Sequence, residues 1–232
     1  MQSVCRNLLN PHISQIHFLA SEARAANFHH LAPHCNVTLG QFNRKARFYP
    51  ATAKFRTALR GGRAWDDRLT AEEAFAWASR TLVGRTAILA NLDIYFDHTL
   101  GLLRSDRWLS PTRMYFLSRY EEDQRVALGT QCGPQYIGSH DAFVFVPPLP
   151  RPLITRCAGL ALGMPGMENR MIHEFRRLGM ELLNPCKSIR SWHLHRSNVR
   201  NGILPLANTE QRSGLVRPNR LLQRPTLDDL SQ

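Results

Sequence analysis

Residues 87–97, Ala-Ile-Leu-Ala-Asn-Leu-Asp-Ile-Tyr-Phe-Asp, decide the expected fold of this chain. An apolar run of this kind is typical of a buried strand in an α/β sheet, and ligands in such sheets bind outside the carboxyl ends of the strands. Because side chains alternate along a strand, Asn91 and Asp93 are expected on one face, where their oxygens suit Mg or Mn. The pattern also fits a plain turn or a helix cap, so the rest of the sequence has to decide.

Predicted helices and strands around this segment support an α/β fold. A helix is expected from Thr70, a suitable N-cap with Glu73 at the capping-box position, and Gly84 ends it. A second helix is predicted over residues 168–178. Further strands are predicted at residues 13–20, 113–120, 142–146, 180–183 and 189–195. This order predicts a single mixed sheet flanked by helices.

The domain organisation follows from length and composition. A chain of 232 residues can bury one sizeable core. Beyond Gly202 the sequence is dominated by Arg, Pro, Gln and Asn. We therefore predict one α/β domain over residues 1–202 and a flexible tail over residues 203–232.

The net charge of +12 comes almost entirely from arginine, since Lys45, Lys54 and Lys187 are the only lysines. Arginine favours planar contact with phosphate or carboxylate, so nucleotides, nucleic acids and anionic surfaces are all admissible partners. A coding bias explains the same composition equally well. The absence of a helix-turn-helix, zinc-finger or RNP-like motif argues against nucleic acid.

Cysteines, hydropathy and one short motif bear on the compartment. The five cysteines are scattered without a Cys-x-x-Cys pair, so neither a zinc knuckle nor a disulfide framework is indicated. No run approaches the ~20 apolar residues of a membrane helix, and a soluble, cytoplasmic protein is the default expectation. Asn36-Val37-Thr38 is a glycosylation sequon, a motif that often occurs by chance.

Several motifs follow the Asn-x-Asp segment in a fixed order. They are Leu117-Ser-Arg119-Tyr, Gly138-Ser-His-Asp141-Ala-Phe, Gly163-Met-Pro-Gly166-Met-Glu168-Asn169, Asn184-Pro185 and His193-Leu-His195. The set resembles a family of GT-A-type, nucleotide-sugar-dependent glycosyltransferase-like proteins. That family's pattern runs Asn-Ser-Asp-Ile-x-Phe-Asp, Leu-Ser/Thr-Arg-Trp, Ser-Gln-Asp-Ala-Trp, Gly-x-x-Gly-x-Asp-Asn, Asn-Pro and His-x-His. The resemblance covers residues 80–200.

The resemblance implies a GT-A-like domain that transfers a sugar from a nucleotide sugar to a glycan or other hydroxyl acceptor. Asp93 and His195 would hold a divalent metal, Mn or Mg, and imidazole suits Mn better. Asp141 would orient or deprotonate the acceptor hydroxyl. The donor would contact Asn91, Arg119, Glu168 and Asn169.

Each assignment has a simpler alternative. Asp141 fits a turn that bonds its own backbone, Glu168 fits a helix start favoured by the helix dipole, and a His-x-His pair is often structural. The chain also departs from the family pattern at five positions, Leu92, Tyr120, His140, Phe143 and Glu168. Most of these substitutions preserve the chemistry or the size of the side chain.

The expected first strand of a GT-A domain, which binds the nucleoside base, is not found before the helix-like residues 4–10. The chain is therefore expected to be N-terminally truncated or catalytically inactive. The alternative functions are a glycosyltransferase-like binding protein without activity and, less favoured, a basic nucleic-acid-binding protein.

Overall fold

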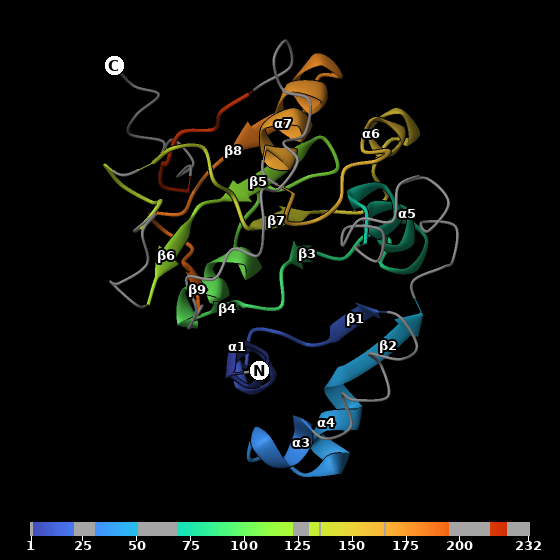
Figure 1. Cartoon of the computed structure of the whole chain (residues 1–232), viewed down its shortest axis with the longest axis vertical. Helices are drawn as coiled ribbons and strands as arrows, with labels where there is room; N and C mark the ends of the chain where they lie inside the picture. Colours follow the sequence, from blue (N-terminus) through green and yellow to red (C-terminus); the bar gives the residue numbers. More distant parts are fainter. Residues whose placement is uncertain are drawn as a thin grey trace.

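A computed structural model describes residues 2–20, 31–50, 69–122, 130–134, 136–164, 166–194 and 214–221 of the chain (Figure 1). The helices are α1 Gln2–Leu9, α3 Leu31–His34, α4 Leu39–Lys45, α5 Ala71–Thr81, the 3-10 helix η3 His98–Arg104, α6 Arg151–Arg156 and α7 Met167–Arg177. The strands are β1 Ile16–Ala20, β2 Ala46–Pro50, β3 Ala87–Ala90, β4 Ile94–Phe96, β5 Arg113–Leu117, β6 Arg119–Glu121, β7 Ala142–Phe145, β8 Glu181–Leu183 and β9 Ser191–His193.

The described strands form three sheets, so the prediction of a single sheet is wrong, although the mixed α/β class is confirmed. A four-stranded sheet has the order β3-β7-β5-β8, and a three-stranded sheet has the order β4-β9-β6. Strands β1 and β2 form a separate parallel pair. The chain passes three times from the larger sheet to the smaller one, from β3 to β4, β5 to β6 and β8 to β9.

The passage from β5 to β6 has a local cause. Ser118 lies between the two strands, and its N–H donates to the Asn184 side-chain oxygen at 3.0 Å instead of to a neighbouring strand. The Asn184 amide group donates back to the Ser118 hydroxyl at 2.9 Å. The backbone ladder is therefore interrupted by a side chain, and the strand predicted over residues 113–120 divides into β5 and β6.

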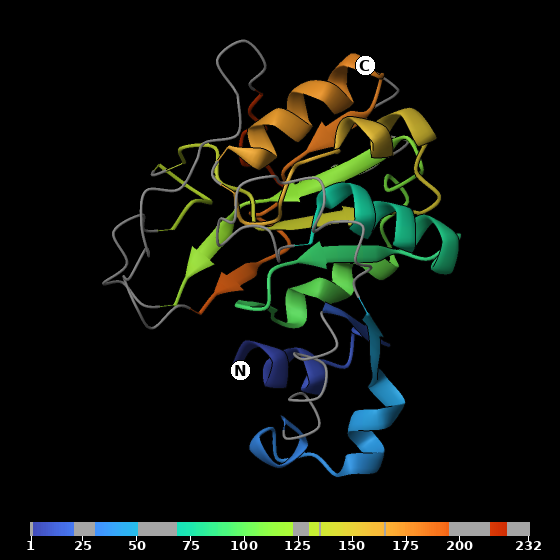
Figure 2. The ribbon, with the colours of Figure 1, turned by 45° about the vertical axis from the view of Figure 1, so that its right-hand side comes forward.

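The main core lies between the four-stranded sheet and helices α5, α6 and α7, which cover one face of this sheet (Figure 2). Phe75 of α5 meets Phe145 of β7 edge-on, with ring centroids 5.1 Å apart. The predicted start of α5 is confirmed, because the Thr70 hydroxyl accepts from the Glu73 N–H at 3.1 Å. The second predicted helix corresponds to α7, and Gly179 after it has a φ of +81°.

Helix α1 seals one edge of the three-stranded sheet. The Asn7 amide nitrogen donates to the Ile94 carbonyl at 2.9 Å, and its oxygen accepts from the Phe96 N–H at 3.0 Å. Asn10 adds a bond from its amide nitrogen to the Phe96 carbonyl at 2.9 Å. Helix α1 and Asn10 just after it thus satisfy backbone groups of β4 that a further strand would otherwise pair.

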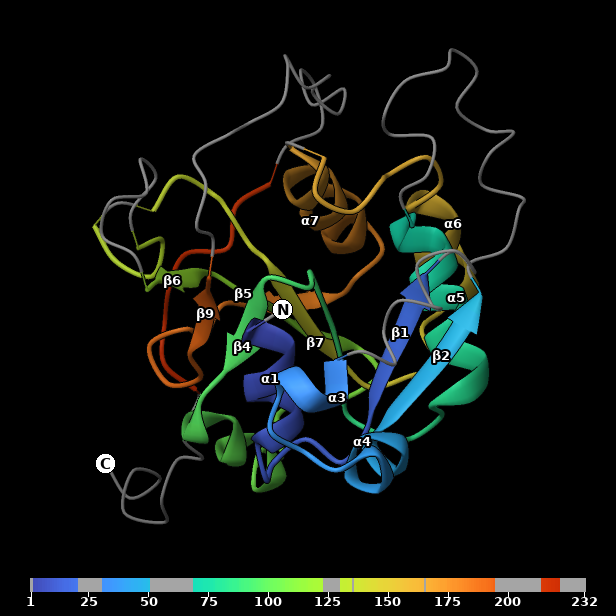
Figure 3. The same cartoon turned by 60° about the horizontal axis from the view of Figure 1, so that its bottom comes forward.

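The N-terminal elements α3, α4, β1 and β2 pack around their own small apolar cluster (Figure 3). A disulfide between Cys5 and Cys35 joins α1 to the end of α3, and a second one joins Cys132 to Cys186. The expectation of no disulfide framework is wrong, because the fold brings together cysteines that are 30 and 54 residues apart in the sequence. No helix in the described part of the chain is long and apolar enough to cross a membrane.

The expected flexible tail does not hold for residues 214–221, which pack against the domain. Val216 is buried, and its carbonyl accepts from the Asn184 amide at 2.9 Å. Asn219 extends this contact, because its N–H donates to the Asn184 carbonyl at 2.8 Å. Residues 203–213 and 222–232 lie outside the described residues.

Candidate functional site

The polar residues after β3 lie on a turn rather than on one strand. Strand β3 ends at Ala90, β4 begins at Ile94, and the Ile94 N–H donates to the Asn91 carbonyl at 3.2 Å. Asn91 and Asp93 therefore do not share a strand face as expected, because the chain changes sheets between them. The turn leaves the Asp93 side chain 42% exposed.

Strands β6 and β9 bring charged side chains to this turn. Arg119 and Glu121 are two residues apart on β6 and so share a face, and Glu121 is the register partner of His193 on β9. His193 Nδ1 lies 2.7 Å from a Glu121 carboxylate oxygen, and its Nε2 lies 3.3 Å from Asp93 Oδ2. His193 therefore bridges a buried carboxylate and a partly exposed one.

The charge state of His193 follows from these partners. Burial alone would lower its pKa, but hydrogen bonds and charge from Asp93 and Glu121 outweigh burial and raise the pKa to about 9. At neutral pH His193 is therefore a cation held between two anions. A metal ion would have to displace this proton before it could bind the imidazole, because metal-bound imidazole must be neutral.

Arg119 continues the series on the other side of Glu121. Its guanidinium is ion-paired with Glu121, and its Nη1 donates to Asp141 Oδ2 at 2.7 Å and to the Ser139 hydroxyl at 3.1 Å. The Arg119 side chain is only 8% exposed. The residue expected to meet the donor is thus turned inward, where it holds Asp141 in place.

Asp93, His193, Glu121, Arg119 and Asp141 together form a row of alternating charge, which we call the charge chain. Its members come from the β3–β4 turn, β9, β6 and the start of β7. Sequence reasoning missed Glu121 and the role of His193. The available signal was a pair of charged residues, Arg119 and Glu121, at alternate positions after a buried strand. The contact of Glu121 with His193 depends on the register of β6 with β9, which the signal does not contain.

A second carboxyl group lies close to Asp141. Burial raises the pKa of Glu168 to about 8, and the negative charge of Asp141 adds to this effect. The glycine-rich turn expected before β7 presents Asp141, and Gly138 there has a φ of +95°. Any other residue at position 138 would place its Cβ 2.9 Å from Asn169 Nδ2, so this turn requires glycine.

Asn169, which the sequence predicts as a donor contact, makes a structural bond. Its amide nitrogen donates to the Gly214 carbonyl at 3.0 Å and so ties α7 to residues 214–221. The last acid of the opening segment, Asp97, is also structural. Burial opposes its ionisation, but hydrogen bonds from Thr99 and Trp192 outweigh burial and lower its pKa.

The opposite face of the small sheet is aromatic. Tyr95, Trp192 and Tyr120 are register partners across β4, β9 and β6, with ring centroids 6.3 Å and 5.2 Å apart in that order. The Arg6 guanidinium lies 4.3 Å from the centre of the Tyr95 ring. The three strands thus separate an aromatic face from the charged face.

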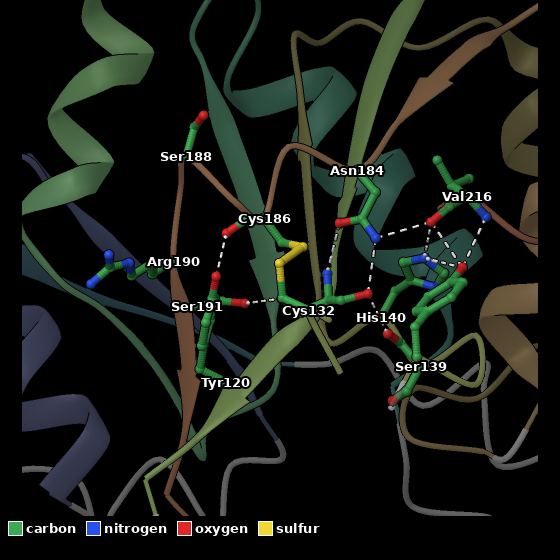
Figure 4. The surroundings of a disulfide bond; sticks show 12 residues. Tyr120, Cys132, Ser139, His140, Asn184, Cys186, Ser188, Arg190, Ser191 and Val216 are labelled. Atoms are coloured by element: carbon green, nitrogen blue, oxygen red, sulfur yellow. Dashed lines mark hydrogen bonds between the residues drawn. A yellow bond between two sulfur atoms is a disulfide. The ribbon is translucent and has the colours of Figure 1, made fainter. Parts of the chain in front are cut away.

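Figure 4 shows the Cys132–Cys186 disulfide and the hydrogen bonds of Asn184, which join segments that are far apart in the sequence. Asn184 is fully buried and makes bonds to Ser118 and to the Val216 carbonyl. His140 is also buried, and burial lowers its pKa to about 4, so it is neutral. Covalent and uncharged polar contacts therefore fix the elements that carry the charges.

The available donor groups limit how a metal ion could bind. Within the described ranges there is no group of three His, Cys, Asp or Glu arranged to hold a metal ion, and the expected ligand His195 lies outside them. Asp93 offers a partly exposed carboxylate. Such a group fits Mg or a similar hard cation in the mode where one or two carboxylates and substrate phosphates share the coordination.

Comparison with protein-family models, curated proteins and solved structures found no significant match.

Proposed function

We propose that the chain is a metal-dependent glycosyltransferase that acts on a nucleotide sugar and a hydroxyl acceptor. The observation that carries this proposal is the charge chain, which links a partly exposed carboxylate at Asp93 to the carboxyl groups of Asp141 and Glu168. Sugar transfer needs these two centres, one for the leaving diphosphate and one for the acceptor hydroxyl.

At the first centre Asp93, with Asn91 beside it on the turn, would hold Mn or Mg together with the donor phosphates. Such a cation supplies neutralisation of the charge that develops on the leaving group. His193 donates toward Asp93 at 3.3 Å and is itself oriented by Glu121 at 2.7 Å. These contacts support the proposal because they fix the direction of the Asp93 carboxylate before any ligand arrives.

At the second centre the two carboxyl groups have different surroundings. Asp141 is ion-paired with Arg119 at 2.7 Å, whereas Glu168, with a pKa of about 8, keeps its proton near neutral pH. Neighbouring carboxyl groups in different environments are typical of acid–base pairs in active sites. Asp141 would orient the acceptor hydroxyl, and Glu168 would hold or release a proton beside it.

Calorimetric titration with Mn and a panel of nucleotide sugars tests the proposal. Wild-type protein is expected to bind a donor only with Mn present, and Asp93→Asn is expected to lose that Mn-dependent component. Glu181→Gln is the matched control, because the Glu181 side chain is 44% exposed and that of Asp93 is 42% exposed. Donor affinity in Asp93→Asn equal to wild type would contradict the assignment.

A binding protein without activity is the second candidate. It is favoured by the internal compensation of Arg119, Glu121 and His193, whose charges are already paired with one another. This second function would be selected by Mn-dependent donor binding with neither sugar transfer to a hydroxyl acceptor nor hydrolysis of the donor.

A further inference from the structure

The sequon Asn36-Val37-Thr38 lies on the surface turn between α3 and α4. The side chains of Asn36 and Thr38 are both exposed. No other Asn-x-Ser/Thr sequence occurs in the chain. The motif plays no part in the proposed sugar transfer, so its presence on an accessible turn calls for its own explanation.

The backbone presents Asn36 outside regular structure. The Val37 N–H donates to the Ala32 carbonyl and the Asn36 N–H to the Pro33 carbonyl, both at 3.2 Å, and Asn36 has a φ of +53°. This is the pattern with which a Schellman motif ends a helix, with Gly or Asn as the left-handed residue. The acceptor amide therefore lies on a surface turn, as sequon recognition requires.

Thr38 supplies the hydroxyl of the sequon and has a structural role as well. Its Oγ1 accepts from the Gln41 N–H at 3.1 Å and caps α4. Serine at this position would keep both the cap and the sequon, whereas alanine would remove both.

The disulfides indicate the compartment. Cys35, the residue before the sequon, is bonded to Cys5, and Cys132 is bonded to Cys186. Disulfides persist in oxidising environments such as the secretory pathway and are rare in the cytosol. They therefore argue against the cytoplasmic location expected from the sequence, and they place the sequon where Asn-linked glycosylation occurs.

The position of the turn is compatible with a bulky modification. Figure 1 shows α3 and α4 at the end of the molecule away from β6, β9 and α7, which carry the candidate site. A glycan at Asn36 would therefore lie away from the elements that carry the charge chain. None of the five residues of the charge chain lies in α3, α4 or the turn between them.

We propose that the chain matures in an oxidising, secretory compartment and carries an N-linked glycan on Asn36. In this step Asn36 Nδ2 loses one proton and forms a bond to the anomeric carbon of an oligosaccharide. The bond from that carbon to a lipid diphosphate breaks, and the lipid diphosphate is the leaving group. This inference does not depend on the proposed transferase activity.

The test is secretion of the full chain from a eukaryotic host behind a cleavable leader, with analysis of the purified protein by intact mass before and after peptide N-glycosidase. The wild type is expected to have two disulfides and an enzyme-sensitive glycoform that maps to Asn36. Asn36→Gly suits the positive φ, so it should keep the fold and the disulfides but lose the glycoform.

Two further variants keep the test decisive if Asn36→Gly is poorly secreted. Thr38→Ser is expected to retain the glycoform, and Thr38→Ala is expected to lose it. A secreted wild-type chain with both disulfides and no enzyme-sensitive mass would overturn the proposal, and so would a glycoform that persists in Asn36→Gly. Five alkylatable thiols in the secreted protein would mean that neither disulfide forms, and the argument for an oxidising compartment would then fail.

Discussion

Replacement of His193 by glutamine should change how stability depends on pH. The pKa of His193 is raised from its ordinary 6.5 to about 9 in the folded protein. The folded state therefore binds this proton more tightly than the unfolded state does. The resulting stabilisation is fully present below pH 6.5 and is lost as pH rises through about 9.

The magnitude follows from the two pKa values and their surroundings. The interval from 6.5 to about 9 corresponds to at most about 3 to 4 kcal/mol, because a shift of one pKa unit is worth about 1.4 kcal/mol. Asp93, one of the two partners, is 42% exposed, and water screens its share of the attraction. We therefore expect about 2 kcal/mol of pH-dependent stabilisation from His193 after this screening.

Urea unfolding at pH 6 and pH 10 measures this effect. The free energy of unfolding of wild type minus that of His193→Gln should fall by about 2 kcal/mol between the two pH values. Subtraction removes the contributions of groups that titrate in both proteins. His34→Gln, on the exposed end of α3, is the matched control for replacing a histidine by glutamine. Parallel profiles for wild type and His193→Gln would refute the bridging role of His193.

Three further perturbations test other parts of the structure. Wild type should lose thermal stability as pH rises from 4.5 to about 8, because folded Glu168 retains a proton that the unfolded chain releases. Glu168→Gln should lose less thermal stability over the same pH range. The same pH dependence of the melting temperature in both proteins would contradict the raised pKa of Glu168. Asn184→Ala should lower the free energy of unfolding by about 3 kcal/mol in urea, since it leaves buried groups such as the Ser118 N–H unpaired; a loss under about 1 kcal/mol would mean that water replaces these bonds. Cys132→Ser with Cys186→Ser should cost up to about 4 kcal/mol, from the loop of 54 residues that the disulfide closes; unchanged stability relative to the oxidised wild type would show that the bond adds nothing.

Local signals in the sequence were enough to predict the two long helices. The Thr70 cap and the regular apolar spacing define α5, and the spacing before Gly179 defines α7. These signals act over a few residues, so they do not require knowledge of the rest of the fold. The predicted strands also correspond to described strands, with shorter bounds.

Long-range contacts explain what the sequence did not predict. The break between β5 and β6 depends on Asn184, which is 66 residues from Ser118. The Glu121–His193 contact joins residues 72 apart and needs the register of β6 with β9. Spacing alone cannot pair such residues, so Asp93, Arg119 and Asp141 were named from the sequence, whereas Glu121 and the bridging position of His193 were not.

The bonds of Asn7 to β4 have a consequence for self-association. Strand β4 is at the edge of its sheet, and α1 occupies the backbone groups that another molecule could otherwise pair with. The Cys5–Cys35 bond attaches this helix to a second part of the N-terminal unit, so separation of α1 requires more than breaking its own contacts. Reduction of the Cys5–Cys35 bond at a low denaturant concentration should therefore expose the edge of β4 to β-pairing with another molecule. The first product formed would then be concentration-dependent oligomers rather than unfolded monomers.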